Sequence, residues 1–67
     1  MITAREPIKN FITSQSSVED LADKLKLSPT TLYSVAKGNN VSAEVVSKLL
    51  NETGFDFEKG FDAEEDK

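Results

Sequence analysis

The 67-residue sequence contains no cysteine and no histidine. The lack of cysteine excludes disulfide bonds and thiolate metal sites. The lack of histidine removes the commonest general base, the commonest metal ligand and any Ser-His or Cys-His catalytic arrangement. A glycine-rich phosphate loop and the ligand spacings of zinc and calcium sites are also missing. We therefore expect no catalytic residues, no metal site and no cofactor, and a protein that is not an enzyme.

Long apolar runs are missing as well. No segment approaches the roughly 20 apolar residues that span a bilayer. The first residues, MITAREPIKNF, lack the apolar centre of a signal peptide. We expect a cytoplasmic protein without membrane contacts, and a chain this short forms one domain with a modest core.

The net charge of −4 is unevenly distributed along the chain. Residues 1–51 carry six basic and five acidic side chains, which gives +1, whereas residues 52–67 carry two basic and seven acidic ones, which gives −5. We expect a folded domain over residues 1–61 and an acidic, disordered tail over residues 62–67. The tail is interpreted as a solvated end, and the alternatives are an electrostatic brake or a contact for a basic partner.

Helical periodicity and capping residues dominate the first half of the chain. Pro7 suits the first turn of a helix over residues 6–14, in which apolar side chains recur at helical spacing. Ser17, followed three positions later by Asp20, predicts the start of a helix over residues 18–25.

The second half of the chain repeats this pattern. Ser28 is a good N-cap for a helix over residues 29–37, and Gly38 can take the left-handed conformation that ends it. Ser42 and Gly54 mark the start and the end of a fourth helix in the same way.

The last segment predicts one further helical turn beside the core. Asp56 is a candidate cap and Gly60 a candidate stop, and the phenylalanines at 55, 57 and 61 are expected to close the core. We see no alternation typical of a strand, so the sequence predicts a compact all-α fold of five short helices. The residues expected to form the centre of its core are Leu21, Ala22, Leu32, Val35, Val46 and Leu49.

Only about three residues separate the helices predicted at 18–25 and 29–37, and so short a connection is typical of a helix-turn-helix. Lys26 occupies the position where a left-handed residue is expected, at a cost on the order of 1 kcal/mol for a residue other than glycine. Leu27 is expected to offset this cost by packing back onto the preceding helix.

Residues 17–56 resemble the phage-repressor helix-turn-helix family of the Cro/cI, XRE type. The residues that carry the resemblance are Leu21-Ala22, Leu27-Ser28, Leu32, Val35, Gly38, Ser42, Leu49 and Gly54. The resemblance implies a lambda-repressor-like domain of five helices, whose third helix enters the major groove of DNA. It also implies a sequence-specific transcriptional regulator, in a phage or bacterial setting, that acts by occupying a double-stranded operator.

The resemblance also implies which residues contact DNA. Thr30 and Ser34 are candidate base readers, and Tyr33 and Lys37 are candidates for phosphate or sugar contacts. The complete set of predicted DNA-binding residues is Ser17, Pro29, Thr30, Thr31, Tyr33, Ser34, Lys37, Asn39 and Asn40.

Structural roles could also explain these residues. Thr30 and Thr31 are ordinary first-turn residues, and Tyr33 could lie flat on the domain. Lys37 complements the negative end of its helix, and the two asparagines after Gly38 are typical turn residues.

Some positions depart from the family pattern and weaken DNA binding. Val18 and Pro29 replace polar side chains that often contact DNA, and Lys37 with the nearby Lys26 supplies the only positive charge of the face. Since phosphate neutralisation drives much of DNA affinity, a homodimer or further domains are needed for tight binding. The alternative function is a protein-binding modulator or antirepressor, which keeps the helix-turn-helix fold and docks on a partner regulator protein.

Overall fold

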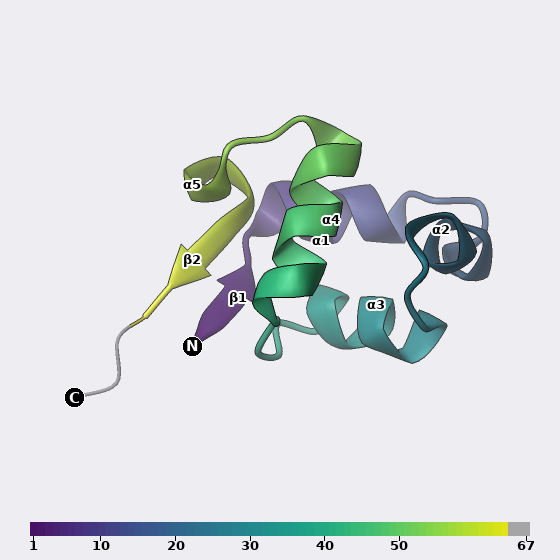
Figure 1. Cartoon of the computed structure of the whole chain (residues 1–67), viewed down its shortest axis with the longest axis horizontal. Coiled ribbons are helices and arrows are strands. Elements are labelled where there is room, and N and C mark those ends of the chain that lie inside the picture. Colours follow the sequence, from purple (N-terminus) through teal and green to yellow (C-terminus); the bar gives the residue numbers. More distant parts are fainter. Residues whose placement is uncertain (65–67) are drawn as a thin grey trace.

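The structure, a computed structural model, describes residues 1–64 of the chain and contains five helices and two short strands over that range. In chain order these are β1 (Ile2–Ala4), α1 (Glu6–Thr13), α2 (Val18–Leu25), α3 (Pro29–Ala36), α4 (Ala43–Thr53), α5 (Phe57–Gly60) and β2 (Phe61–Ala63) (Figure 1). The predicted helix 18–25 is confirmed in full, and the predicted helices 6–14 and 29–37 each end one residue earlier.

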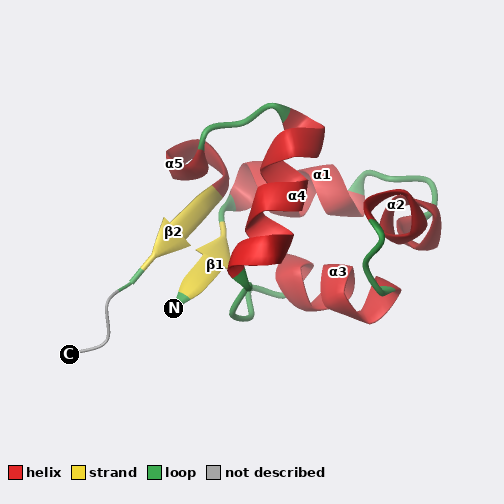
Figure 2. Cartoon of the chain, in the orientation of Figure 1, coloured by secondary structure: helices red, strands yellow, loops and turns green. Residues whose placement is uncertain are grey.

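The expectation of an all-α fold without strands is wrong in one respect. β1 and β2 form an antiparallel sheet in which Ile2, Thr3 and Ala4 lie opposite Ala63, Asp62 and Phe61 (Figure 2). Each strand is too short to display an alternating pattern, and the pairing joins segments from the two ends of the described chain, so no local signal predicts it.

The sheet also changes the interpretation of the acidic end of the chain. Asp62 and Ala63, which we assigned to a disordered tail, lie in β2. The Arg5 side chain holds this strand, because its Nε donates to the Phe61 carbonyl oxygen at 2.9 Å and its Nη2 lies 3.3 Å from the Asp62 carboxylate. Residues 65–67 of the predicted tail lie outside the described residues.

Serine caps begin three of the helices as predicted. The hydroxyl oxygens of Ser17, Ser28 and Ser42 each accept a hydrogen bond from the backbone amide three residues later, at 3.2, 3.2 and 3.4 Å. These bonds satisfy amides that the helix itself leaves unpaired. They fix where α2, α3 and α4 start, and therefore which side chains each helix turns inward.

The last helix departs from its predicted caps. Asp56 stands at the N-cap position of α5 but makes no side-chain capping bond. Gly60 is buried and does not take a left-handed conformation. It serves close packing instead, because a Cβ atom there would lie 3.0 Å from Cγ1 of Ile8.

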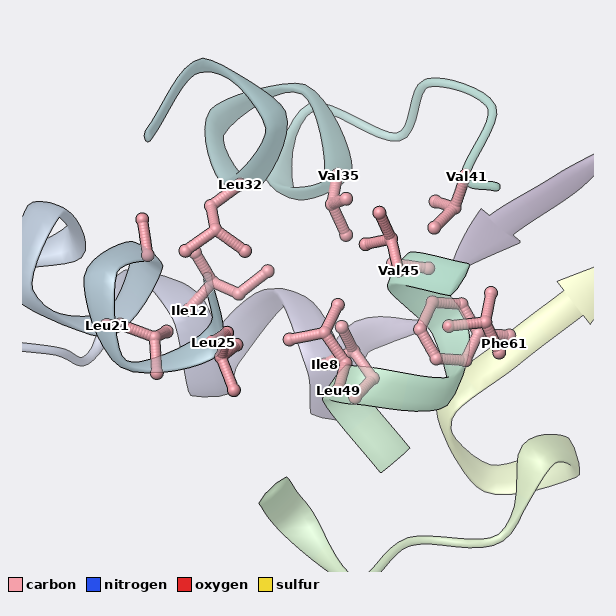
Figure 3. Close-up of a cluster of buried hydrophobic side chains, with 13 residues drawn as sticks. Ile8, Ile12, Leu21, Leu25, Leu32, Val35, Val41, Val45, Leu49 and Phe61 are labelled. Carbon is pink, nitrogen blue, oxygen red and sulfur yellow. The ribbon is translucent and has the colours of Figure 1, made fainter. Parts of the chain in front are cut away.

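One apolar cluster forms the core between the helices and the sheet. It contains all the predicted central residues, and Figure 3 shows Leu32 and Val35 pointing into it from α3. Of the three phenylalanines expected to close the core, Phe61 is 1% exposed, Phe55 is half-buried, and Phe57 stacks on Phe61 but stays 38% exposed. The further members of the cluster are Ala4, Ile8, Ile12, Leu25, Val41, Val45 and Phe61.

Candidate nucleic-acid interface

The turn between α2 and α3 fixes how α3 is presented. Lys26 follows α2 in the left-handed conformation, with φ 59° and ψ 42°, as predicted. Its amide donates to the Asp23 carbonyl oxygen at 3.1 Å, and the Leu27 amide donates to the Ala22 carbonyl oxygen at 2.8 Å. Leu27 packs against the core. This paired arrangement satisfies the last carbonyls of α2 and turns the chain sharply into α3.

The two sides of α3 differ in character. Leu32 and Val35 are almost fully buried, at 0% and 2% exposure. The opposite side carries Thr30, Tyr33 and Lys37, all exposed. Tyr33 keeps half of its surface in solvent. The helix therefore presents a polar side, held in place by an apolar one.

Five of the predicted DNA-binding residues line one hollow on this polar side: Thr30, Tyr33, Ser34, Lys37 and Asn39. We call these residues the α3 face. A second hollow lies next to it, between α3 and the start of α4, and shares Thr30 and Ser34 with the α3 face. It is also lined by Thr31, Asn40 and Ser42, and by the buried side chains of Val35, Val41 and Val45.

The hydroxyl groups of α3 differ in whether hydrogen bonds within the protein already engage them. The Thr31 hydroxyl lies 2.8 Å from the Ser28 hydroxyl, and the Thr31 amide donates to the same Ser28 oxygen. Thr31 is thus part of the N-cap of α3. The Ser34 hydroxyl accepts a hydrogen bond from the Asn39 side chain at 3.0 Å. Within residues 1–64, the hydroxyls of Thr30 and Tyr33 make no hydrogen bond, so Thr30 offers the most available hydroxyl near the start of the helix.

The remaining predicted residues lie at the margins of the α3 face. Ser17 lines neither hollow, and its hydroxyl caps α2. Pro29 is half-buried at the first position of α3. The Asn40 side-chain oxygen accepts a hydrogen bond from the Ile2 amide at 3.0 Å, and the Val41 amide donates to the Ile2 carbonyl oxygen at 2.7 Å. The loop after α3 is therefore tied to β1.

Positive charge near the α3 face is sparse. Lys37 and Lys26 are exposed. Carboxylates occupy the first turns of the neighbouring helices, with Glu19 and Asp20 in α2 and Glu44 in α4. Acidic side chains there favour the helix dipole, but they also stand where phosphates would otherwise bind.

One further cation lies near the end of α3. The Lys9 side chain reaches from α1 to Gly38, and its Nζ lies 3.5 Å from the position that a Cβ atom of Gly38 would take. Sequence reasoning did not assign this lysine to the site. It predicted Ser28 and Ser42 only as helix caps, although Ser42 lines the second hollow and Ser28 bonds to Thr31, which also lines it. The serine caps were visible in the sequence, whereas the approach of Lys9 depends on how α1 packs against α3.

The described residues form no metal-binding cluster and no membrane-spanning helix. Among residues 1–64, no three or more carboxylate, histidine or cysteine side chains gather where they could hold a metal ion. None of the helices described there is long and apolar enough to cross a bilayer.

Comparison with known proteins places the fold in a family. No curated protein and no solved structure matches the chain. A family profile described as helix-turn-helix matches residues 10–59, which include all of α2, α3 and α4. The match covers 50 of the 67 residues (59 − 10 + 1). The chain therefore belongs to the XRE-type helix-turn-helix family, whose members are DNA-binding transcription regulators that often form dimers.

Proposed function

We propose that the chain is a sequence-specific transcription regulator of the Cro/cI kind, which occupies an operator by inserting α3 into the major groove. The observation that carries the proposal is the exposed polar side of α3, with Thr30 and Tyr33 unbonded within the described chain, over a buried side anchored by Leu32 and Val35. The major groove of B-DNA accepts one α-helix, and side chains near the start of that helix reach base edges.

Each residue of the α3 face has a role in this proposal. Thr30 reads a base, because its hydroxyl is free to hydrogen-bond a base edge and its methyl group suits a thymine methyl. Ser34 reads a second base one turn later. Lys37 neutralises a phosphate, and Tyr33 lies against phosphate or sugar.

Residues at the margins of the α3 face contact the phosphate backbone of the duplex and hold it in position. Pro29 and Thr31 lie in the first turn of α3, which carries no carboxylate and where the helix dipole favours phosphate. Ser17, whose hydroxyl oxygen caps α2, contacts phosphate through its hydroxyl hydrogen. Asn39 and Asn40, just after α3, donate to phosphate oxygens through the side-chain N–H groups that their bonds within residues 1–64 leave unused. Because the charge of one domain is small, we propose that two copies bind together and that each occupies one half-site.

The test is a selection from random duplexes with the purified chain, followed by titration of variants across salt concentration. Thr30→Ala should weaken binding to the selected duplex by about 1–3 kcal/mol and leave binding to unrelated duplexes unchanged. Lys37→Ala should weaken binding to all duplexes alike and reduce the salt slope by about one unit. The matched control is Lys59→Ala, which removes the same charge from α5, outside the α3 face, and should leave the salt slope unchanged.

A second candidate function is a modulator that binds another regulator protein. It is favoured by the half-exposed Tyr33, because aromatic side chains anchor protein interfaces. It is also favoured by the carboxylates in the first turns of α2 and α4, because carboxylates repel phosphates. A selection that enriches no motif would refute operator recognition and favour this function. Tyr33→Ala, rather than Lys37→Ala, should then weaken binding to the partner.

A further inference from the structure

Two hydrogen bonds join Asn39 to Ser34. The Asn39 amide donates to the Ser34 carbonyl oxygen at 3.1 Å, and the Asn39 side-chain Nδ2 donates to the Ser34 hydroxyl oxygen at 3.0 Å. Gly38, with φ 91°, makes the turn that brings Asn39 back over the last turn of α3. The side-chain amide of Asn39 is therefore held against the Ser34 hydroxyl by the backbone as well as by its own bond.

This contact determines what the Ser34 hydroxyl can offer. A serine hydroxyl has one O–H donor and two lone pairs. Asn39 Nδ2 occupies one lone pair, and within residues 1–64 the Ser34 O–H has no acceptor. Accepting a hydrogen bond polarises a hydroxyl and strengthens it as a donor. Ser34 thus presents a hydrogen to whatever approaches the α3 face.

The major-groove edges of the four bases respond differently to a donor. Guanine and thymine carry keto oxygens there and offer acceptors, N7 and O6 in guanine and O4 in thymine. Cytosine presents the N4 amino donor, and adenine presents the N6 amino donor beside N7. Because N7 of both purines is an acceptor, a donor aimed at N7 does not separate guanine from adenine. A donor held at the position of guanine O6 or thymine O4 favours a keto base over an amino base in the contacted strand.

We infer that Asn39 is a positioning residue that fixes Ser34 as a hydrogen-bond donor, so that Ser34 selects a keto base at its position in the operator. This inference rests on the proposed function, because it concerns the same α3 face. It adds a role in specificity, acting through Ser34, to the phosphate contact proposed for Asn39.

The decisive variant is Asn39→Asp. A carboxylate at this position has acceptors only, so the Ser34 O–H turns toward it and leaves lone pairs for the base. The preference at that position should then pass from keto to amino bases. Asn39→Ala removes the partner altogether, leaves the hydroxyl free to rotate, and should weaken the preference in both directions.

The experiment begins with the selected duplex and Ser34→Ala, which identifies the base pair that depends on Ser34. The parent and the variants then compete for four duplexes that differ only at this pair. The parent should bind duplexes with a keto base in the contacted strand about two- to twelvefold more tightly than duplexes with an amino base there, the range that one neutral hydrogen bond allows. Asn39→Asp should bind the duplexes with an amino base there more tightly, and Asn39→Ala should discriminate less than the parent.

Base analogues identify the acceptor itself. Guanine analogues without N7 or O6, or a thymine analogue without O4, are placed in the preferred pair one at a time. Loss of O6 or O4 should abolish the discrimination of the parent, loss of N7 should not, and no analogue should change the discrimination by Ser34→Ala. Asn40→Asp is the matched control, since it adds the same charge at the next residue and keeps an oxygen for the Ile2 amide. It should weaken binding to all four duplexes alike.

The outcomes separate the inference from the proposed function. A selection that enriches no motif overturns both. An enriched motif with the full parental discrimination among the four duplexes kept in Asn39→Ala overturns the inference alone, even where Asn39→Asp binds too weakly to be ranked. The inference alone is also overturned if no base analogue changes the discrimination by the parent. Thermal melts of each variant check that it is folded.

Discussion

The left-handed residue between α2 and α3 gives the sharpest stability prediction. Lys26, with φ 59°, is the only residue other than glycine in residues 1–64 with a positive φ. An L-residue pays about 1–2 kcal/mol for this conformation. In Lys26→Gly this cost disappears, while the greater freedom of glycine in the unfolded chain opposes the gain by about 0.4–1 kcal/mol. Since the turn bonds involve only backbone atoms, they are kept, and we expect a net stabilisation of about 0.5–1 kcal/mol.

Thermal unfolding followed by circular dichroism measures this effect. For a domain of this size, the expected gain raises Tm by about 2–8 °C. Lys26→Ala is the control, because it removes the same side chain and charge but keeps the strained conformation, and it should not be stabilised. If the glycine and alanine variants melt at the same temperature, backbone strain at residue 26 does not limit stability, and the reasoning fails.

Three further predictions concern the core and the caps. Leu32→Ala, at a side chain with 0% exposure, should cost about 2–5 kcal/mol in urea unfolding, and a parental midpoint would contradict our placement of the core. Gly60→Ala should cost about 1–3 kcal/mol, because the new methyl group meets Cγ1 of Ile8 at 3.0 Å, and an unchanged Tm would show that this contact yields freely. Ser28→Ala should cost about 1 kcal/mol, because the Thr31 amide loses its capping acceptor, and equal unfolding free energies would show that water replaces the serine without loss.

Helix boundaries could be predicted from the sequence because their causes are local. Ser17, Ser28 and Ser42 each cap an amide three positions away, and such a bond needs no distant partner. The strain at Lys26 follows from the shortness of the turn alone. Gly60 shows the limit of this reasoning, since its role depends on the approach of Ile8 from a different helix.

Which side chains of α3 face solvent could be predicted from the sequence, but their hydrogen bonds could not. The side of α3 that faces solvent follows from the spacing of Leu32 and Val35. That Asn40 bonds to β1, or that Thr31 shares its hydroxyl with Ser28, depends on distances fixed only in the folded chain. Residue type therefore indicated where a contact is possible, and the fold determines which groups remain free to make it.

The pairing of β1 with β2 has a consequence for the order in which the protein folds. It joins residues far apart in the chain, with the Met1 amino group bonded to the Glu64 carbonyl oxygen across 63 positions. The entropy of closing so long a loop must be lost before these contacts add stability, whereas neighbouring helices such as α2 and α3 meet across a short turn. We therefore expect the helices to assemble first and the sheet to close after the rate-limiting step. Substitutions at Thr3 or Asp62 should accelerate unfolding and leave the folding rate almost unchanged. The loop at Asn40, bonded to β1, becomes fully ordered only in that last step.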